Sequence, residues 1–261
     1  GAVMAIVPLL ILYKTKGKPI SYRFSKDSWL GLILILAAVL RLARIAWNEI
    51  EGDEALILMQ ASQAIAGRED IVFWHKKGPA ELLIPMVAWL SSGTMSEGIA
   101  RTPFAILSIA AVLSGYEFSR RWSGKESALI SAALIATNGY FVAYGRIVQY
   151  QSVILLMVPL AFVHLVEDRR GSAFLAGLFM GFALLAHYDA VIVLPAFGYA
   201  LLAARWTTGR CWSRVLSAAC GLLVVTLPFY GPFLLSEGFE FATSYLIGAR
   251  ISGGGPLFRS N

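Results

Sequence analysis

The chain has 261 residues, of which 57% are apolar and only 15% are charged, and its mean hydropathy is +0.67. A soluble domain of this length needs more charged residues to cover its surface, so the composition excludes a soluble globular protein. Cys211 and Cys220 have no partners at the spacing of metal ligands, and nothing in the sequence points to a nucleic acid as partner.

Apolar segments separated by short charged loops predict an all-α, polytopic integral membrane bundle, because a helix satisfies its own backbone groups in hydrocarbon. We expect about eight transmembrane helices, the first of them partial, at 1–13, 28–47, 102–118, 127–144, 152–166, 172–186, 190–204 and 215–235. A transmembrane domain is therefore predicted over 1–235. A polar, non-cytoplasmic tail follows at 236–261 and is expected to continue in a longer protein.

Between the spans at 28–47 and 102–118 lies a polar outer loop, 48–79, followed by a short apolar segment. This segment, 79–90, is too short to cross a hydrocarbon core of ~30 Å comfortably. It also contains Glu81, Pro85 and Trp89. We therefore expect short interfacial helices in the first outer loop, with an interfacial helix over 79–94.

The orientation follows from the basic residues, which concentrate in cytoplasmic loops of membrane proteins. With an interfacial 79–94, the cytoplasmic loops contain Lys14, Lys16, Lys18, Arg23, Lys26, Arg120, Arg121, Lys125, Arg169, Arg170, Arg205, Arg210 and Arg214. The longer outer segments contain only Arg68, Lys76, Lys77, Arg101, Arg146, Arg250 and Arg259. The sequence thus places the loop 48–79 and the turns 145–151 and 187–189 on the non-cytoplasmic side.

The first candidate site is Gly52-Asp53-Glu54-Ala55 in the outer loop. Asp53 and Glu54 stand where a short helix begins, and acidic residues stabilise the first turn of a helix. One interpretation is therefore an acidic helix start with solvated loop charges. The other is a carboxylate at the membrane surface that serves as a general base or binds a cation.

Three further polar groups lie on the same predicted side. His75, Lys76 and Lys77 precede the interfacial segment, and the lysines either reach water or bind phosphate. Arg146, in the turn that ends at Gln151, either reaches water or pairs with an anion, for which Asp53 and Glu54 are candidates. The last group, His187-Tyr188-Asp189, is either a helix cap or part of a site.

The order of these motifs resembles that of the GT-C glycosyltransferases. The shared order is a basic linker, a span, Gly-Asp-Glu-Ala in the first outer loop, Lys-Gly-Pro before an interfacial helix, and an arginine in the second outer turn. The similarity extends over about 41–205 and is strongest to the branch with the protein O-mannosyltransferases and the lipid A aminoarabinose transferase. It implies a polyprenyl-phosphate sugar donor, a catalytic acidic residue that maps to Asp53 with Glu54 beside it, and a phosphate contact at Lys77 or Lys76 with Pro79.

Gln151 departs from the family pattern, in which many members carry an acidic residue after the arginine of the second outer turn. A metal site with two carboxylates is therefore not indicated, although Asp189 is a candidate for a second carboxylate. No motif in the sequence indicates a cofactor, and a divalent metal stays an open alternative without a motif of its own.

The leading hypothesis is a glycosyltransferase in a bacterial inner (plasma) membrane, active on its non-cytoplasmic face. Asp53 and Glu54 are the candidate catalytic residues, and the residues expected to bind the lipid phosphate or the sugar are His75, Lys76, Lys77, Arg146, Gln151, His187 and Asp189. The alternative is a non-catalytic GT-C-like subunit with partner subunits in a larger membrane complex. A secondary transporter ranks last, because its ionisable residues would lie near the bilayer midplane rather than at helix ends.

Overall fold

The computed structural model describes residues 28–47, 49–68, 70–75, 77–167, 171–203 and 211–245. The partial span predicted at 1–13, the basic linker at 14–27, Lys76 and the tail beyond 245 lie outside the described residues. Within the described ranges every regular element is a helix, which confirms the all-α prediction.

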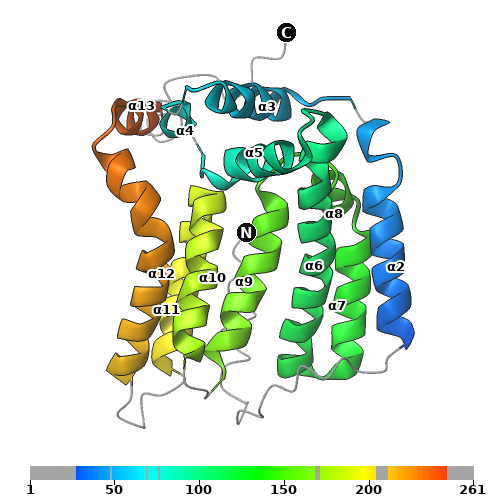
Figure 1. Ribbon diagram of the computed structural model, residues 1–261. Coiled ribbons are helices and arrows are strands. Elements are labelled where there is room, and N and C mark those ends of the chain that lie inside the picture. The colour runs from blue at the N-terminus through cyan, green and yellow to red at the C-terminus, as the bar shows by residue number, and fades with distance from the viewer. Residues whose placement is uncertain are drawn as a thin grey trace.

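The helices form two layers (Figure 1). The larger layer is a bundle of helices that run side by side: α2 (Ser28–Leu42), α6 (Glu97–Ser123), α7 (Lys125–Thr137), α9 (Gln151–Leu165), α10 (Ser172–Ala186), α11 (Leu194–Ala203) and α12 (Cys211–Leu234). Two short 3-10 helices extend the series, η1 (Ile45–Trp47) after α2 and η2 (Tyr188–Val193) before α11.

The smaller layer, which we call the cap, consists of α3 (Gly52–Ile65), α4 (Ile71–Trp74) and α5 (Ala80–Ser92). Figure 1 shows α3 and α5 lying across one end of the bundle, roughly perpendicular to its helices. Two short helices from later in the chain, α8 (Gly139–Tyr144) and α13 (Glu237–Tyr245), lie at the same end. The α5 orientation is the one expected of an interfacial helix, and its depth in a membrane stays a prediction.

Among the described residues, three helices are long and apolar enough to cross a membrane: Trp29–Trp47, Glu97–Ser123 and Trp212–Leu234. The apolar helices Gln151–Leu165, Ser172–Ala186 and Tyr188–Ala203 are shorter. An α-helix rises 1.5 Å per residue, so the 15 residues of α9 span only about 22 Å. An integral membrane bundle is therefore supported, while the number of about eight crossings stays a prediction.

Local sequence signals explain where the helices begin and end. Ser96 caps the start of α6, where its hydroxyl accepts a hydrogen bond from the Ile99 N–H at 3.4 Å. The segment 127–144, expected as one span, is instead divided between α7 and α8 at Asn138. The reason is that the Asn138 backbone is extended and its side chain accepts from the Phe141 N–H, which starts a new helix.

Glycines allow α10 and α12 to approach closely. A Cβ on Gly177 would collide with the carbonyl of Ala218, and a Cβ on Gly221 would collide with the carbonyl of Phe174. Small residues at such positions permit backbone-to-backbone packing between membrane helices. Helices α10 and α12 therefore pack with their backbones in close approach.

Candidate active site

Asp53, Lys77 and His187, which were singled out from the sequence, lie with Tyr150 where the cap covers the bundle. Asp53 lies in the first turn of α3, and Lys77 lies just before α5. Tyr150 immediately precedes α9, and His187 follows α10. Segments from four places in the chain thus converge at one end of the molecule.

Asp53 and Lys77 form an ion pair, with 3.0 Å between Lys77 Nζ and Asp53 Oδ2. The Asp53 side chain is 59% exposed and the Lys77 side chain 21% exposed. An ion pair with one partner this exposed contributes only ~0–1 kcal/mol, so a ligand can separate it at little cost. The same Nζ lies 5.6 Å from the centroid of the Tyr150 ring, within the range of a cation–π contact.

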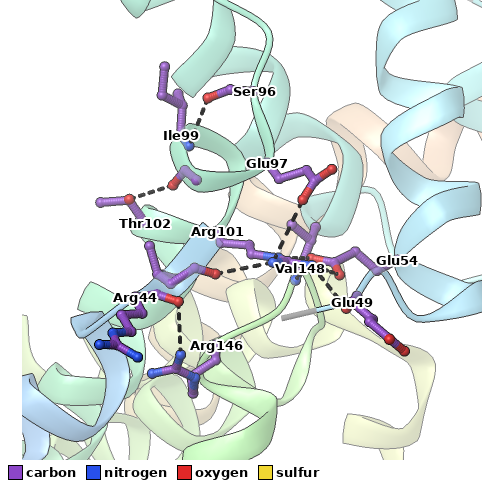
Figure 2. Close-up of polar contacts among 12 residues, drawn as sticks. Arg44, Glu49, Glu54, Ser96, Glu97, Ile99, Arg101, Thr102, Arg146 and Val148 are labelled. Carbon is purple, nitrogen blue, oxygen red and sulfur yellow. Dashed lines mark hydrogen bonds and ion pairs between the residues drawn. The ribbon is translucent and has the colours of Figure 1, made fainter. Parts of the chain in front are cut away.

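Glu54, the neighbour of Asp53, is fully buried and binds Arg101 of α6 in a fork (Figure 2). Arg101 Nε and Nη2 each donate to a different carboxylate oxygen of Glu54 at 2.7 Å. The Val148 N–H donates to Glu54 Oε1 at 3.0 Å, so the carboxylate also fixes the turn before α9. Glu54 is therefore shielded from solvent, whereas Asp53 is open to it.

Arg101 was missed as a site residue because the span was expected to begin at Thr102, which placed the arginine in a loop. Helix α6 begins at Glu97 instead. Arg101 is therefore fully buried, and it also donates to the carbonyls of Ile45 at 3.1 Å and Glu49 at 3.3 Å. A charged residue at the start of an apolar helix needs a partner, and this requirement is the signal that could have identified it.

Glu81 is a second buried carboxylate that sequence reasoning did not propose for the site. Its Oε1 accepts from the Tyr150 N–H at 2.7 Å, and its Oε2 lies 3.1 Å from His75 Nε2. The other ring nitrogen of His75 lies 2.9 Å from Gln60 Oε1 on α3. His75, expected to contact the substrate, is therefore buried in a network that joins α3, α5 and the turn before α9.

Arg146 lies against the end of α2. Its guanidinium donates to the carbonyls of Leu40 at 2.8 Å and Arg44 at 3.2 Å, and the second contact is drawn in Figure 2. The last carbonyls of a helix have no partner within it, so a nearby guanidinium satisfies them. The carboxylate of Glu54, which the sequence offered as a partner for Arg146, is paired with Arg101 instead.

The Tyr150 ring is stacked on His187, with centroids 3.9 Å apart and planes at 25°. Burial, and secondarily the negative charge of Asp189, raises the pKa of Tyr150 to about 12, so its phenol stays neutral at physiological pH. Asp189 is 43% exposed, and its carboxylate lies 3.4 Å from His187 Nδ1. Tyr150 therefore contacts both Lys77 and His187, and Asp189 lies beside His187.

Gln151, at the start of α9, has a buried side-chain oxygen with no hydrogen-bond partner among the described residues. Lys76, the other candidate phosphate ligand, lies outside the described residues. Among the residues that the structure describes, no three His, Cys, Asp or Glu side chains are grouped as a metal site. Asp53 is thus an exposed carboxylate beside the Lys77 ammonium group.

A comparison with curated proteins finds no match to the chain. A comparison with family profiles matches residues 79–231, more than half of the chain, to dolichyl-phosphate-mannose-protein mannosyltransferase. The match includes Glu81, Arg101, Arg146 and the turn at Tyr150, and it begins just after Lys77. Proteins of this family sit in a membrane and use a polyprenyl-phosphate sugar as donor. The chain therefore belongs to the dolichyl-phosphate-mannose-protein mannosyltransferase family, within the GT-C superfamily of membrane glycosyltransferases.

Proposed function

We propose that this protein transfers a sugar from a polyprenyl phosphate to an acceptor hydroxyl at the cap end of the bundle, with inversion at the sugar carbon. The observation that carries the proposal is the ion pair of Asp53 and Lys77, with 3.0 Å between the charged atoms. It places a solvent-exposed carboxylate beside an ammonium group at the end where apolar helices meet polar loops. A lipid-linked donor and a water-borne acceptor both reach such a position.

In the proposed reaction the acceptor oxygen attacks the anomeric carbon of the sugar. The bond between that carbon and the phosphate oxygen breaks, and the acceptor proton passes to the Asp53 carboxylate. Negative charge develops on the leaving phosphate. The Lys77 ammonium, which lies beside the base Asp53, stabilises this charge on the phosphate. The products are the glycosylated acceptor and the free polyprenyl phosphate.

Glu54 and Arg146 take structural roles in this proposal. The Glu54 carboxylate is buried and accepts three hydrogen bonds, two from Arg101 and one from Val148, so no acceptor hydroxyl reaches it. Arg146 donates to carbonyls at the end of α2. Both residues fix the backbone around the site, and Asp53 remains as the base.

Charge supports a non-cytoplasmic position for the cap end. The opposite end of the bundle, where α6 meets α7 and α12 begins, has the basic residues Arg120, Arg121, Lys125 and Arg214. Basic residues concentrate on the cytoplasmic side of membrane proteins. We therefore place the cap on the outer side of a bacterial plasma membrane.

The test is Asp53→Asn in the full-length protein, with Asp70→Asn as matched control. Asp70 is an exposed acid of the same loop whose partner is Arg68. The assay measures release of polyprenyl phosphate from a panel of polyprenyl-phosphate hexoses in membranes. Loss of a general base lowers the rate about 10²–10⁴-fold, so we expect such a loss for Asp53→Asn and none for Asp70→Asn. Full activity of Asp53→Asn would overturn the proposed role of Asp53.

The alternative is a non-catalytic subunit of a membrane complex, and Gln151 motivates it because a carboxylate is common at that position in the family. The same assay separates the two functions. A folded wild-type protein that turns over none of the donors, and that copurifies with a stable set of membrane proteins, would favour the subunit.

A further inference from the structure

Glu81 is an unusual acid because it is fully buried and uses both carboxylate oxygens. One oxygen accepts from the backbone of Tyr150 at 2.7 Å, and the other lies 3.1 Å from His75 Nε2. Both ring nitrogens of His75 thus lie within hydrogen-bond distance of a side-chain oxygen, Nε2 of Glu81 and Nδ1 of Gln60. Burying a carboxylate is costly, and these contacts offset that cost only if they are well formed.

Glu81 Oε2, the oxygen near His75, also lies 4.0 Å from Lys77 Nζ. Lys77 therefore has two acidic neighbours, Asp53 and Glu81. They differ in mobility. Asp53 is largely exposed and has no further hydrogen bond from another residue among the described side chains, whereas Glu81 is fixed from two sides. When an anion binds Lys77, Asp53 can move away and Glu81 cannot.

Glu81 also determines where Tyr150 lies. Its hydrogen bond fixes the Tyr150 backbone, and the Tyr150 ring contacts both Lys77 and His187. His75 extends the support to Gln60 of α3, the helix that bears Asp53 in its first turn. The positions of Asp53, Lys77 and the Tyr150 ring thus all depend, directly or through one further residue, on the buried carboxylate of Glu81.

We propose that Glu81 is the positioning residue of the donor site, where it holds Lys77 and Tyr150 in place when the polyprenyl phosphate replaces Asp53 at Lys77. The inference rests on the proposed function, since it takes Lys77 as the phosphate ligand. It assigns Glu81 an effect on the donor and leaves proton removal to Asp53.

Simple electrostatics and positioning predict opposite results for Glu81→Gln. Removing a negative charge near Lys77 makes the local potential more positive, which by itself would strengthen phosphate binding. Removing the fixed partner of Lys77 lets the ammonium move, which weakens binding. The sign of the change therefore separates the two effects.

The experiment measures binding of a polyprenyl phosphate, with the matching polyprenol as reference, to full-length protein in micelles. We expect Glu81→Gln to bind the phosphate about tenfold more weakly, the effect of losing one charge-assisted contact. The KM for the donor should rise more than kcat falls, and the KM for the acceptor should not change. Glu126→Gln, an exposed acid at the start of α7, is the matched control and should behave like wild type.

Glu81→Asp is the second variant, in case glutamine prevents folding. It keeps the charge and withdraws the carboxylate by one methylene, so phosphate binding should lie between wild type and Glu81→Gln. Equal or tighter binding by a folded Glu81 variant would overturn the inference alone. Failure of wild type to bind phosphate better than polyprenol would overturn the proposed function and, with it, this role of Glu81.

Discussion

Replacing Glu54 by glutamine tests whether the two adjacent acids Asp53 and Glu54 have different roles. Glutamine keeps the shape of the side chain and one acceptor oxygen, but its amide group would place a donor against the guanidinium of Arg101. The variant therefore leaves a fully buried arginine without its carboxylate partner. We expect the protein to lose stability, and activity only to the extent that less of it is folded.

The size of the loss follows from the contacts that remain. Breaking a buried ion pair by removing one partner costs about 3–5 kcal/mol. The carbonyls of Ile45 and Glu49 still accept from Arg101, at 3.1 and 3.3 Å, and Glu97 still lies 3.9 Å away. These contacts partly compensate the charge, so we expect the lower end of that range, about 3 kcal/mol.

The assay is the free energy of unfolding in mixed micelles, followed by far-UV circular dichroism as the fraction of SDS rises. Glu97→Gln is the matched control because it removes the other acid near Arg101. The Glu97 side chain is 41% exposed. An ion pair with one exposed partner and 3.9 Å between its charged atoms contributes at most about 1 kcal/mol, so this control should stay within that limit. If Glu54→Gln is as stable as Glu97→Gln, the buried pair does not secure the fold and the reasoning is refuted.

Two further predictions concern the same end of the molecule. Gly78→Ala should lower both stability and donor affinity, because the added Cβ would collide with the Leu185 carbonyl and displace Lys77. Thermal unfolding measures the stability, and polyprenyl-phosphate binding measures the donor affinity. Gly52→Ala is the control, because a Cβ at Gly52 would meet open space. A neutral effect at both glycines would contradict it. For Tyr150, burial raises the pKa to about 12, above the ordinary value of about 10. The folded state therefore binds the phenol proton more tightly, and this contribution to stability is complete below pH ~10 and is lost as the pH rises towards ~12. Tyr150→Phe should flatten the fall in melting temperature over that range, and an unchanged slope would argue against it.

The class of protein could be predicted from the sequence because it depends on composition and on the lengths of apolar segments. Lipid removes the competition of water for backbone hydrogen bonds, so apolar runs of this kind are helical almost regardless of the rest of the chain. The bounds of α10, Ser172–Ala186, agree with those expected. The break at Asn138 was not predicted, because a side-chain hydrogen bond decides it within a segment that is otherwise long and apolar enough for one span.

The sequence also placed polar groups at one end of the bundle, since helices joined by short turns return their ends to the same side. It did not determine which of those groups are buried. Residues of the types of His75, Arg146 and Glu81 are usually found at protein surfaces. In this protein, however, His75 and Glu81 are buried and Arg146 binds backbone carbonyls. Their partners come from distant segments, and spacing along the chain has no information on such contacts.

The segment Gly52-Asp53-Glu54-Ala55 shows most clearly what the sequence determines and what the tertiary structure determines. The sequence by itself determined that two acids begin a short helix at the end of a membrane bundle. Only the tertiary structure decided that Glu54 is buried against Arg101 while Asp53 lies exposed beside Lys77. Neighbouring residues on a helix point about 100° apart, so one of two adjacent acids can face the bundle and the other the solvent. Which one does so depends on how α3 is rotated over the bundle, and packing between distant segments sets that rotation.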